Sequence, residues 1–417
     1  MRKTSFDPDR LLDSGWGVIT PVTSDPSQVS QRLHDLAPLL KWRESNTGER
    51  YKQLEYRPEE TAAAFLARHG LRPGFTDPER LPYYLLIAGS PEEISFSFQV
   101  GLGESYAVGR LWFDNPQSYE SYAQMLVKFE RGGRDYNRAV TFFGPANRDD
   151  QASTFIAYKL LRPLFERVQQ ESSDWRVMLV DPGSATKKRL MQILLEERPR
   201  LLVTSGQGAA FPPDHARQRA LQGGIVCQDW PGPVKWTGDL QQEFLITGED
   251  VPADADLSGM IGFHMSDYSL GTPLRSEAQA MLFDDIPELT RQPFVASLPQ
   301  ALLAHGALAS VGLADKFWNV GFPNLTLFTP DTLVIAETCL RSLLQGATLG
   351  VAMQPFRQRA VELASQLAML REEAQFGKSV DSQEMVTTWA TLSTLNNLLV
   401  FGDPAVRLIP RMETSAY

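Results

Sequence analysis

Thiol catalysis needs a cysteine beside an imidazole, and this sequence offers few residues of either type. An active thiol also needs a base or cation that lowers its pKa. Cys227 ends the apolar run GGIVC, and Cys339 lies in an apolar helical segment, so we interpret both as buried and structural. A pair of Cys227 with His215 or His264 stays open as the alternative. The five histidines are His34, His69, His215, His264 and His305.

Other kinds of catalytic or metal site have weaker signals in this chain. No histidine stands at metal-ligand spacing from another histidine or cysteine, and the loop PADADLS (252–258) lacks the remaining ligands of a calcium site. The serines Ser205, Ser266 and Ser269 follow apolar runs, but none lies in the G-x-S-x-G turn of serine hydrolases. We therefore expect neither a metal nor a cofactor.

A glycine-rich stretch, TSGQGAAF (204–211), follows one apolar run. Gly206 and Gly208 are spaced so that backbone N–H groups can cradle a phosphate. The dinucleotide fingerprint requires a third glycine where this chain has Phe211. A tight turn is the preferred interpretation. A nucleotide or small-molecule sensor stays open, and free N–H groups at 205–209 would favour it.

These stretches lie among alternating strand and helix patterns. Such alternation predicts a mostly parallel sheet covered by helices on both faces. Functional loops then follow the carboxyl ends of the strands, as 204–211 and the loop after 260–266 do. We expect strands at 83–89, 139–144, 175–180, 200–206, 260–266 and 307–312, and a strand and turn at 395–408. We expect helices at 155–171, 185–197, 331–346 and 356–374, and a segment at 294–306 that begins extended and becomes a helix.

Composition narrows the class of protein. The chain has 417 residues and a formal net charge of −10, so nucleic acid is not an expected partner. The N-terminus lacks the apolar segment of a signal peptide, and no apolar run is long enough to span a membrane. With only two cysteines, we expect a reduced, cytoplasmic protein with no membrane association.

Several stretches, in order, resemble the caspase–gingipain group of cysteine peptidases, particularly bacterial gingipain-like proteins. PYYLLIAGSPEEISFSFQ (82–99) with YAVGRLWFD (106–114) is similar to the N-terminal subdomain of that group. RLLVTSGQG (200–208) resembles the strand and loop that carry the catalytic histidine, and MIGFHMSDYSLGTP (260–273) those that carry the nucleophile. NLLVFGDPAVRL (397–408) resembles the closing Gly-Asp-Pro segment.

The resemblance implies a fold with two parts. It implies a caspase-like three-layer α/β/α sandwich with a mostly parallel sheet, preceded by a smaller α/β subdomain as in gingipains. We expect the N-terminal subdomain over 1–135 and the caspase/gingipain-like domain over 136–417, with the boundary near the glycines of RGGRD.

Both positions of the catalytic pair differ from the family pattern. Gln207 stands where the histidine is expected and Asp267 where the cysteine is expected, although Gly-Thr-Pro is retained at 271–273. Glutamine does not titrate, and a carboxylate is a poor nucleophile toward an amide. The resemblance therefore predicts an inactive peptidase homologue that binds a peptide or a protein. An active paralogue is one such protein partner. We expect Gln207 and Asp267 to bond to each other within a vestigial pocket of Gly206, Gly208, Asp229, Ser266 and Tyr268.

Overall fold

The computed structural model describes residues 6–23, 25–132, 137–281, 284–318 and 330–410. Within them, ten strands form one twisted sheet in the order β2-β1-β3-β4-β14-β13-β10-β7-β5-β6. Two short ribbons, β8–β9 and β11–β12, lie outside it. The strands are β1 (Trp16–Pro21), β2 (Tyr51–Tyr56), β3 (Tyr84–Ala88), β4 (Ala107–Leu111), β5 (Ala139–Phe143), β6 (Arg176–Leu179), β7 (Leu201–Ser205), β8 (Ile225–Val226), β9 (Leu245–Ile246), β10 (Ile261–Met265), β11 (Gly271–Thr272), β12 (Phe294–Val295), β13 (Ala309–Leu313) and β14 (Leu398–Gly402).

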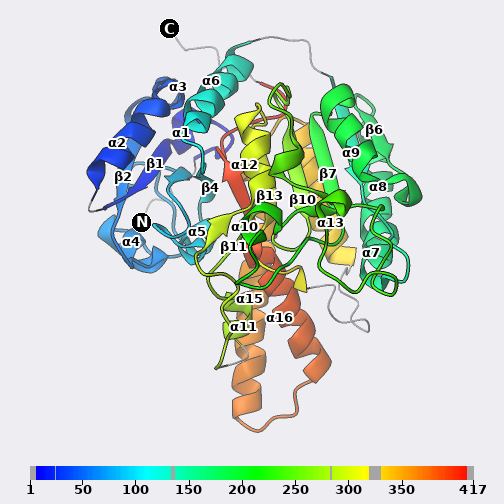
Figure 1. Ribbon diagram of the computed structural model, residues 1–417. Helices are drawn as coiled ribbons and strands as arrows, with labels where there is room; N and C mark the ends of the chain where they lie inside the picture. The colour runs from blue at the N-terminus through cyan, green and yellow to red at the C-terminus, as the bar shows by residue number, and fades with distance from the viewer. Residues whose placement is uncertain (1–5, 24, 133–136, 282–283, 319–329, 411–417) are drawn as a thin grey trace.

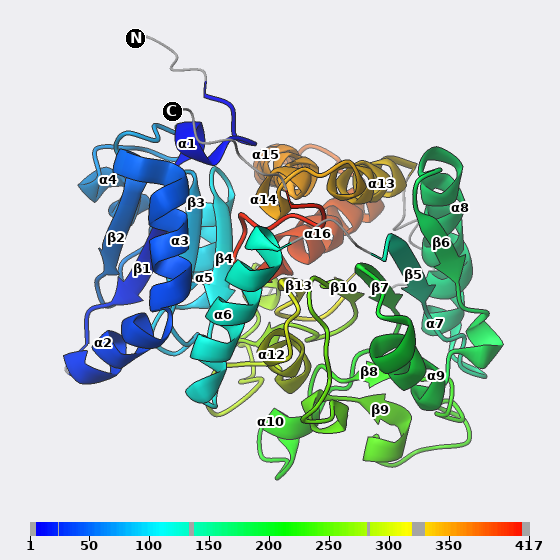
Figure 2. The same cartoon turned by 90° about the horizontal axis from the view of Figure 1, so that it is seen from above.

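Helices cover both faces of the sheet. Seen from above, α13, α14, α15 and α16 lie on one side, and α6, α12 and α9 lie on the other (Figure 2). This three-layer α/β/α arrangement confirms the predicted fold class. The helices are α1 (Leu11–Ser14), α2 (Pro26–Asp35), α3 (Ala37–Thr47), α4 (Ala62–Arg68), α5 (Phe96–Gly103), α6 (Gln117–Arg131), α7 (Gln151–Phe155), α8 (Arg162–Glu171), α9 (Lys187–Gln192), α10 (Gln218–Leu221), α11 (Glu277–Ala280), α12 (Ser297–Ala304), α13 (Pro330–Leu344), α14 (Leu349–Ala352), α15 (Gln354–Gln375) and α16 (Ser382–Asn397).

Strand β14 is the seam between two halves of the sheet. It pairs in parallel with β4 and antiparallel with β13. The strands from β2 to β14 therefore run opposite to those from β13 to β6. As a result, the carboxyl ends of β5, β7, β10 and β13 meet at one edge, where β14 begins. This edge is where parallel α/β sheets usually place functional loops.

A long helical hairpin projects from that edge. Helices α15 and α16 pack against each other and extend beyond the body of the protein (Figure 1). Midway along α16, Trp389 Nε1 donates a hydrogen bond to the carbonyl oxygen of Ala278 in α11. The ring of Trp389 also lies 5.1 Å from that of Trp318, just after β13. The hairpin is thus packed directly against the loops that follow β10 and β13.

The chain turns sharply at the end of β14. Gly402 has φ +113°, a backbone conformation that disfavours side chains. A Cβ on Gly109 of β4 would lie 2.1 Å from the Gly402 carbonyl oxygen, so neither glycine has room for a side chain. The turn brings Asp403 into the interior, where it is fully buried.

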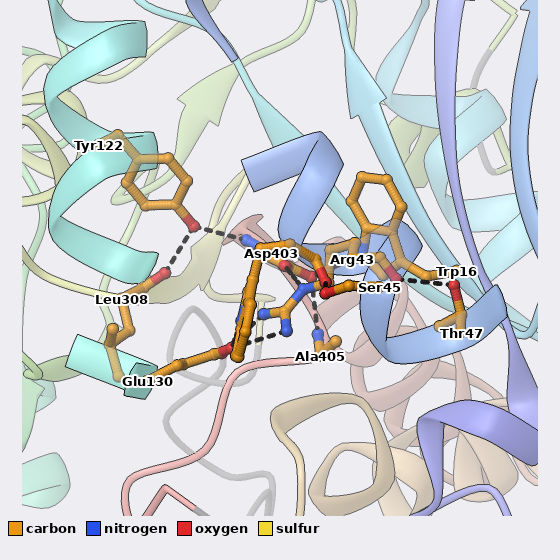
Figure 3. Close-up of polar contacts among 10 residues, drawn as sticks. Trp16, Arg43, Ser45, Thr47, Tyr122, Glu130, Leu308, Asp403 and Ala405 are labelled. Carbon is orange, nitrogen blue, oxygen red and sulfur yellow. Dashed lines mark hydrogen bonds and ion pairs between the residues drawn. The ribbon is translucent and has the colours of Figure 1, made fainter. Parts of the chain in front are cut away.

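Buried polar contacts fix Asp403 there (Figure 3). Its carboxylate accepts hydrogen bonds from Arg43 Nε at 2.6 Å and from Trp16 Nε1 at 3.0 Å. The Arg43 guanidinium also donates two bonds, of 2.7 and 2.8 Å, to Glu130 at the end of α6. The Tyr122 hydroxyl accepts from Asp403 N–H and donates to a carbonyl before β13. We call Trp16, Arg43, Tyr122, Glu130 and Asp403 the β14 clamp.

Most expected elements lie where the sequence places them. The expected strand at 200–206 is β7, and the expected helix at 356–374 is α15. The segment at 294–306 is the short strand β12 followed by α12, as its extended start indicated. The division into subdomains at residue 135 stays a prediction. Part of that boundary, 133–136, lies outside the described residues.

Candidate functional site

The two expected dyad positions lie on neighbouring strands in register. Strand β7 pairs in parallel with β10, with Ser205 opposite Met265. Two residues later, Gln207 and Asp267 begin adjacent loops. A Cβ on Gly208 would lie only 2.0 Å from the Asp267 carbonyl oxygen, so the two loop backbones touch and glycine is required. The fold therefore brings the two positions together, as expected from the sequence.

The Asp267 carboxylate bonds to backbone. Its Oδ1 accepts the Phe317 N–H at 2.6 Å, and the Gly208 N–H also points to this carboxylate. Burial raises the pKa of Asp267 above its usual range, and these hydrogen bonds oppose part of that rise. The expected bond to Gln207 is not the one formed. Asp267 instead joins the loops after β7, β10 and β13.

Gln207 bonds to a residue that sequence reasoning missed. Its Nε2 lies 3.2 Å from each carboxylate oxygen of Asp150, in the loop after β5. Asp150 is buried, and it also caps α7 by accepting the N–H groups of Ala152 and Ser153. An aspartate just before a helix is a recognisable N-cap signal. That signal predicts the cap alone, because the contact with Gln207 depends on the order of β5 and β7.

The loop after β10 is fixed in an unusual backbone conformation. Tyr268 has φ +55°, and its N–H donates to the Asp315 carbonyl oxygen at 3.0 Å. Burial raises the pKa of the Tyr268 phenol, with nearby Asp315 and Asp267 adding to the rise. Such a conformation in a bulky residue is uncommon and is found at functional sites. Tyr268 thus lies at the centre of the strand-end loops.

A second carboxylate, Asp315, is buried in the loop after β13. Its Oδ2 accepts the Ser276 hydroxyl at 2.5 Å, and its Oδ1 accepts the Lys316 N–H at 2.7 Å. Burial raises the pKa of Asp315 to about 6. A carboxyl group with a perturbed pKa at a strand end marks a candidate functional site. We define the strand-end site as Asp150, Gln207, Asp267, Tyr268 and Asp315.

The remaining predicted pocket residues divide into two groups. Gly206 and Ser266 lie at the strand-end site, where Gly206 N–H donates to the Met265 carbonyl oxygen. Ser266 is buried, and its hydroxyl has no hydrogen-bond partner among the described residues. Asp229 is exposed and lies elsewhere, because its carboxylate accepts the Lys187 N–H at the start of α9.

The surroundings of Cys227 do not favour the alternative catalytic pair of Cys227 with His215 or His264. Cys227 is fully buried, its Sγ lies 3.6 Å from the Ile225 carbonyl oxygen, and burial raises the pKa of its thiol. His264 Nδ1 is bonded to Thr204, and burial lowers its pKa to about 4. His215 stacks on Phe211 instead. Within the described part of the chain, no imidazole hydrogen-bonds to either cysteine.

The glycine-rich loop has little capacity for a phosphate. The N–H groups of Gly206, Gly208 and Ala209 donate to Met265, Asp267 and Gly224 respectively. The Gly206 and Ala209 donors are therefore engaged within the protein, and the Gly208 N–H points to the Asp267 carboxylate, which leaves little of the free N–H surface at 205–209 that a nucleotide sensor would need. Among the described residues, no three or more His, Cys, Asp or Glu side chains form a group that could hold a metal. No described helix is long and apolar enough to cross a membrane.

Comparisons with known proteins give similarity in structure and none in sequence. No family model matches the chain, and no curated protein matches it. A solved structure of a protease is similar over 95% of this chain and 79% of that chain, with a TM-score of 0.52 and 10% identity. The separase–securin complex of Saccharomyces cerevisiae matches 79% of this chain and 16% of the chain compared, with a TM-score of 0.37 and 8% identity. The first similarity shows that the chain has a fold also used by a protease.

Proposed function

We propose that this chain is a non-hydrolytic homologue of the caspase–gingipain peptidases that binds a peptide or protein at the strand-end site. One observation carries the proposal. The two adjacent strand ends that would hold a base and a nucleophile instead hold Gln207 and Asp267, and both side chains are bonded to structural partners. Neither can supply the thiolate and imidazole that amide cleavage by this fold requires.

The chemistry of the site suits binding better than cleavage. Asp150, Asp267 and Asp315 place three carboxylates at one sheet edge, and the Ser266 hydroxyl has no partner among the described residues. Carboxylates accept hydrogen bonds and favour cationic groups, so a peptide with N–H donors or a basic side chain fits this edge. An active paralogue is one partner of this kind.

A cleavage assay on a proteome-derived peptide library tests the absence of hydrolysis. We expect the wild-type protein and the variants Cys227→Ala and Asp267→Asn to leave every peptide intact, while an active peptidase of the same fold cleaves its own substrates in parallel. Cleavage by the wild type that is lost in Cys227→Ala would make Cys227 the nucleophile and overturn the proposal. Loss of cleavage in Asp267→Asn alone would instead assign catalysis to Asp267.

The same library, screened for binding, tests the positive half of the proposal. Asp267→Asn keeps the shape of the side chain and removes its charge, so we expect peptides retained by the wild type to be released by this variant. Asp174→Asn is the matched control, because Asp174 is 79% exposed and distant in sequence from the strand-end loops. Equal retention by all three proteins would show that the strand-end site is not where peptides bind.

A further inference from the structure

A pocket lies near the base of the helical hairpin, at the same sheet edge as the strand-end site but outside it. It is lined by the end of α5, the start of β4, the first turns of α15 and the junction of α16 with β14, and its volume is about 210 Å³. Helix α14 contacts both β4 and α15, so the hairpin begins beside the N-terminal strands (Figure 2). No residue of the strand-end site lines this pocket.

Most of the pocket wall is apolar and buried. Side chains from β4, the start of α15 and β14 form it, chiefly Val108, Met353, Phe356, Ala360, Leu399 and Val400. An apolar cavity of roughly 150 Å³ in another protein stays dry and binds benzene, a six-carbon ring. In the same proportion, this pocket has room for an apolar group of roughly eight carbon atoms.

One cation in the pocket wall has no counter-charge. Arg357 is partly buried, and its Nη2 donates to the Tyr83 hydroxyl at 2.9 Å and to the Gly350 carbonyl oxygen at 2.8 Å. Within the described part of the chain, no carboxylate forms an ion pair with Arg357, and its Nε and Nη1 have no hydrogen-bond partner. These N–H groups are therefore available to an anion.

The position of Arg357 in its helix adds to this positive potential. Arg357 lies in the first turn of α15, which contains no acidic residue. The first turn of a helix is the positive end of its dipole, where a cation is unfavourable and an anion is stabilised. The carboxylate of Glu104 also lines the pocket, but it is exposed to water and forms no ion pair with Arg357. An anion bound beside Arg357 balances a charge that the described residues leave uncompensated.

We propose that this pocket binds a medium-chain carboxylic acid, such as octanoate. Its carboxylate pairs with Arg357, and its alkyl chain occupies the apolar part of the pocket. An alcohol of the same length fills the pocket but leaves Arg357 without a counter-charge, and an amine places a second cation beside it. This site goes beyond the proposed peptide binding and does not depend on it.

Titration calorimetry with three ligands of equal chain length tests the proposal. Octanoate is expected to bind at least about tenfold more tightly than 1-octanol or octylamine, because only octanoate accepts a charge-assisted hydrogen bond from Arg357. Equal affinity for the three ligands, tighter binding of octylamine, or no binding of octanoate would overturn the proposal.

Two neutral substitutions in the pocket wall separate the two charges. Arg357→Gln is expected to weaken octanoate binding by about tenfold or more and to leave 1-octanol binding unchanged, because only the carboxylate uses the cation. Glu104→Gln is the matched control, since it also removes one charge from the wall, and it is expected to bind octanoate no more weakly than the wild type. Unchanged octanoate affinity in Arg357→Gln would contradict the proposed pairing, as would an equal loss of both ligands.

A pair of substitutions on one helix locates the binding site. Ala364 and Ala368 are both exposed residues of α15, but only Ala364 lines the pocket. Ala364→Phe is expected to abolish octanoate binding, because the new ring occupies the pocket. Ala368→Phe is expected to bind octanoate with wild-type affinity. Loss of binding in both variants, or in neither, would show that octanoate binds elsewhere.

Discussion

Replacement of Arg43 with methionine is expected to lower the free energy of unfolding by about 3–5 kcal/mol. The Arg43 side chain is 1% exposed and bonds to both Asp403 and Glu130. Its removal leaves two carboxylates inside the protein without their cation, which costs far more than the lost attraction of a surface pair. The effect is large because the β14 clamp holds the seam between the two halves of the sheet.

Denaturant unfolding measures this effect. Arg43→Lys keeps the charge but not the planar fork that reaches both carboxylates, so we expect an intermediate loss. Arg291→Met is the control, because Arg291 pairs with Asp214 at the surface, and we expect an unchanged unfolding midpoint. If Arg43→Met unfolds at the same denaturant concentration as the wild type, the β14 clamp is not a stabilising element.

Replacement of Asp315 with asparagine is expected to stabilise the protein at pH 8 by about 1–3 kcal/mol. Burial raises the pKa of Asp315 from 3.8 to about 6, so the folded state binds more protons than the unfolded state between these values. Stability therefore falls as pH rises through this window, and each pKa unit corresponds to about 1.4 kcal/mol. An amide carries no charge and can still bond to Ser276 and to the Lys316 N–H.

Denaturant unfolding at a series of pH values tests this prediction. The quantity to compare is the difference in unfolding free energy between Asp315→Asn and the wild type. It is expected to be near zero at pH 3.5, to grow between pH 4 and 6, and to stay constant above pH 7. Because both proteins share His264, whose lowered pKa acts in the opposite direction, its contribution cancels in the difference. A pH-independent difference would mean that Asp315 is charged at ordinary pH without cost.

Regular elements were predictable where one pattern dominated. β5 and β7 are short apolar runs buried along their whole length, and both were expected. β2 was missed because only Leu54 and Tyr56 of YKQLEY are buried. The exposed positions of this strand are polar, as is usual for a strand at the edge of a sheet. α16 was missed because SQEMVTTWATLSTLNN is rich in threonine, which favours helices weakly, and packing against α15 stabilises it instead.

The candidate site was predictable only in part. The register of β7 and β10 brings Gln207 and Asp267 together, as the order of motifs implied. The partners of these side chains were not predictable, because Asp150 and Phe317 lie 57 and 50 residues away in sequence. Those contacts depend on which strands are neighbours in the sheet, and local patterns do not encode that order. The β14 clamp could not be predicted from the sequence for the same reason.

Positions 207 and 267 follow neighbouring strands in register, as a base and a nucleophile would, but neither reacting group is present there. Alkylation of an introduced thiol tests this arrangement most directly, with Asp267→Cys compared with Asp267→Cys/Gln207→His across pH. Burial raises the thiol pKa values of Cys227 and Cys339, so the native cysteines add little background.

We expect the added histidine to lower the pKa of the new thiol, because an imidazolium beside a thiolate stabilises it. Alkylation at pH 6 should then be at least about tenfold faster in the double variant than in the single variant, with similar rates above pH 9. Superimposable pH profiles in the two variants would show that positions 207 and 267 do not form such a pair, and would contradict this arrangement.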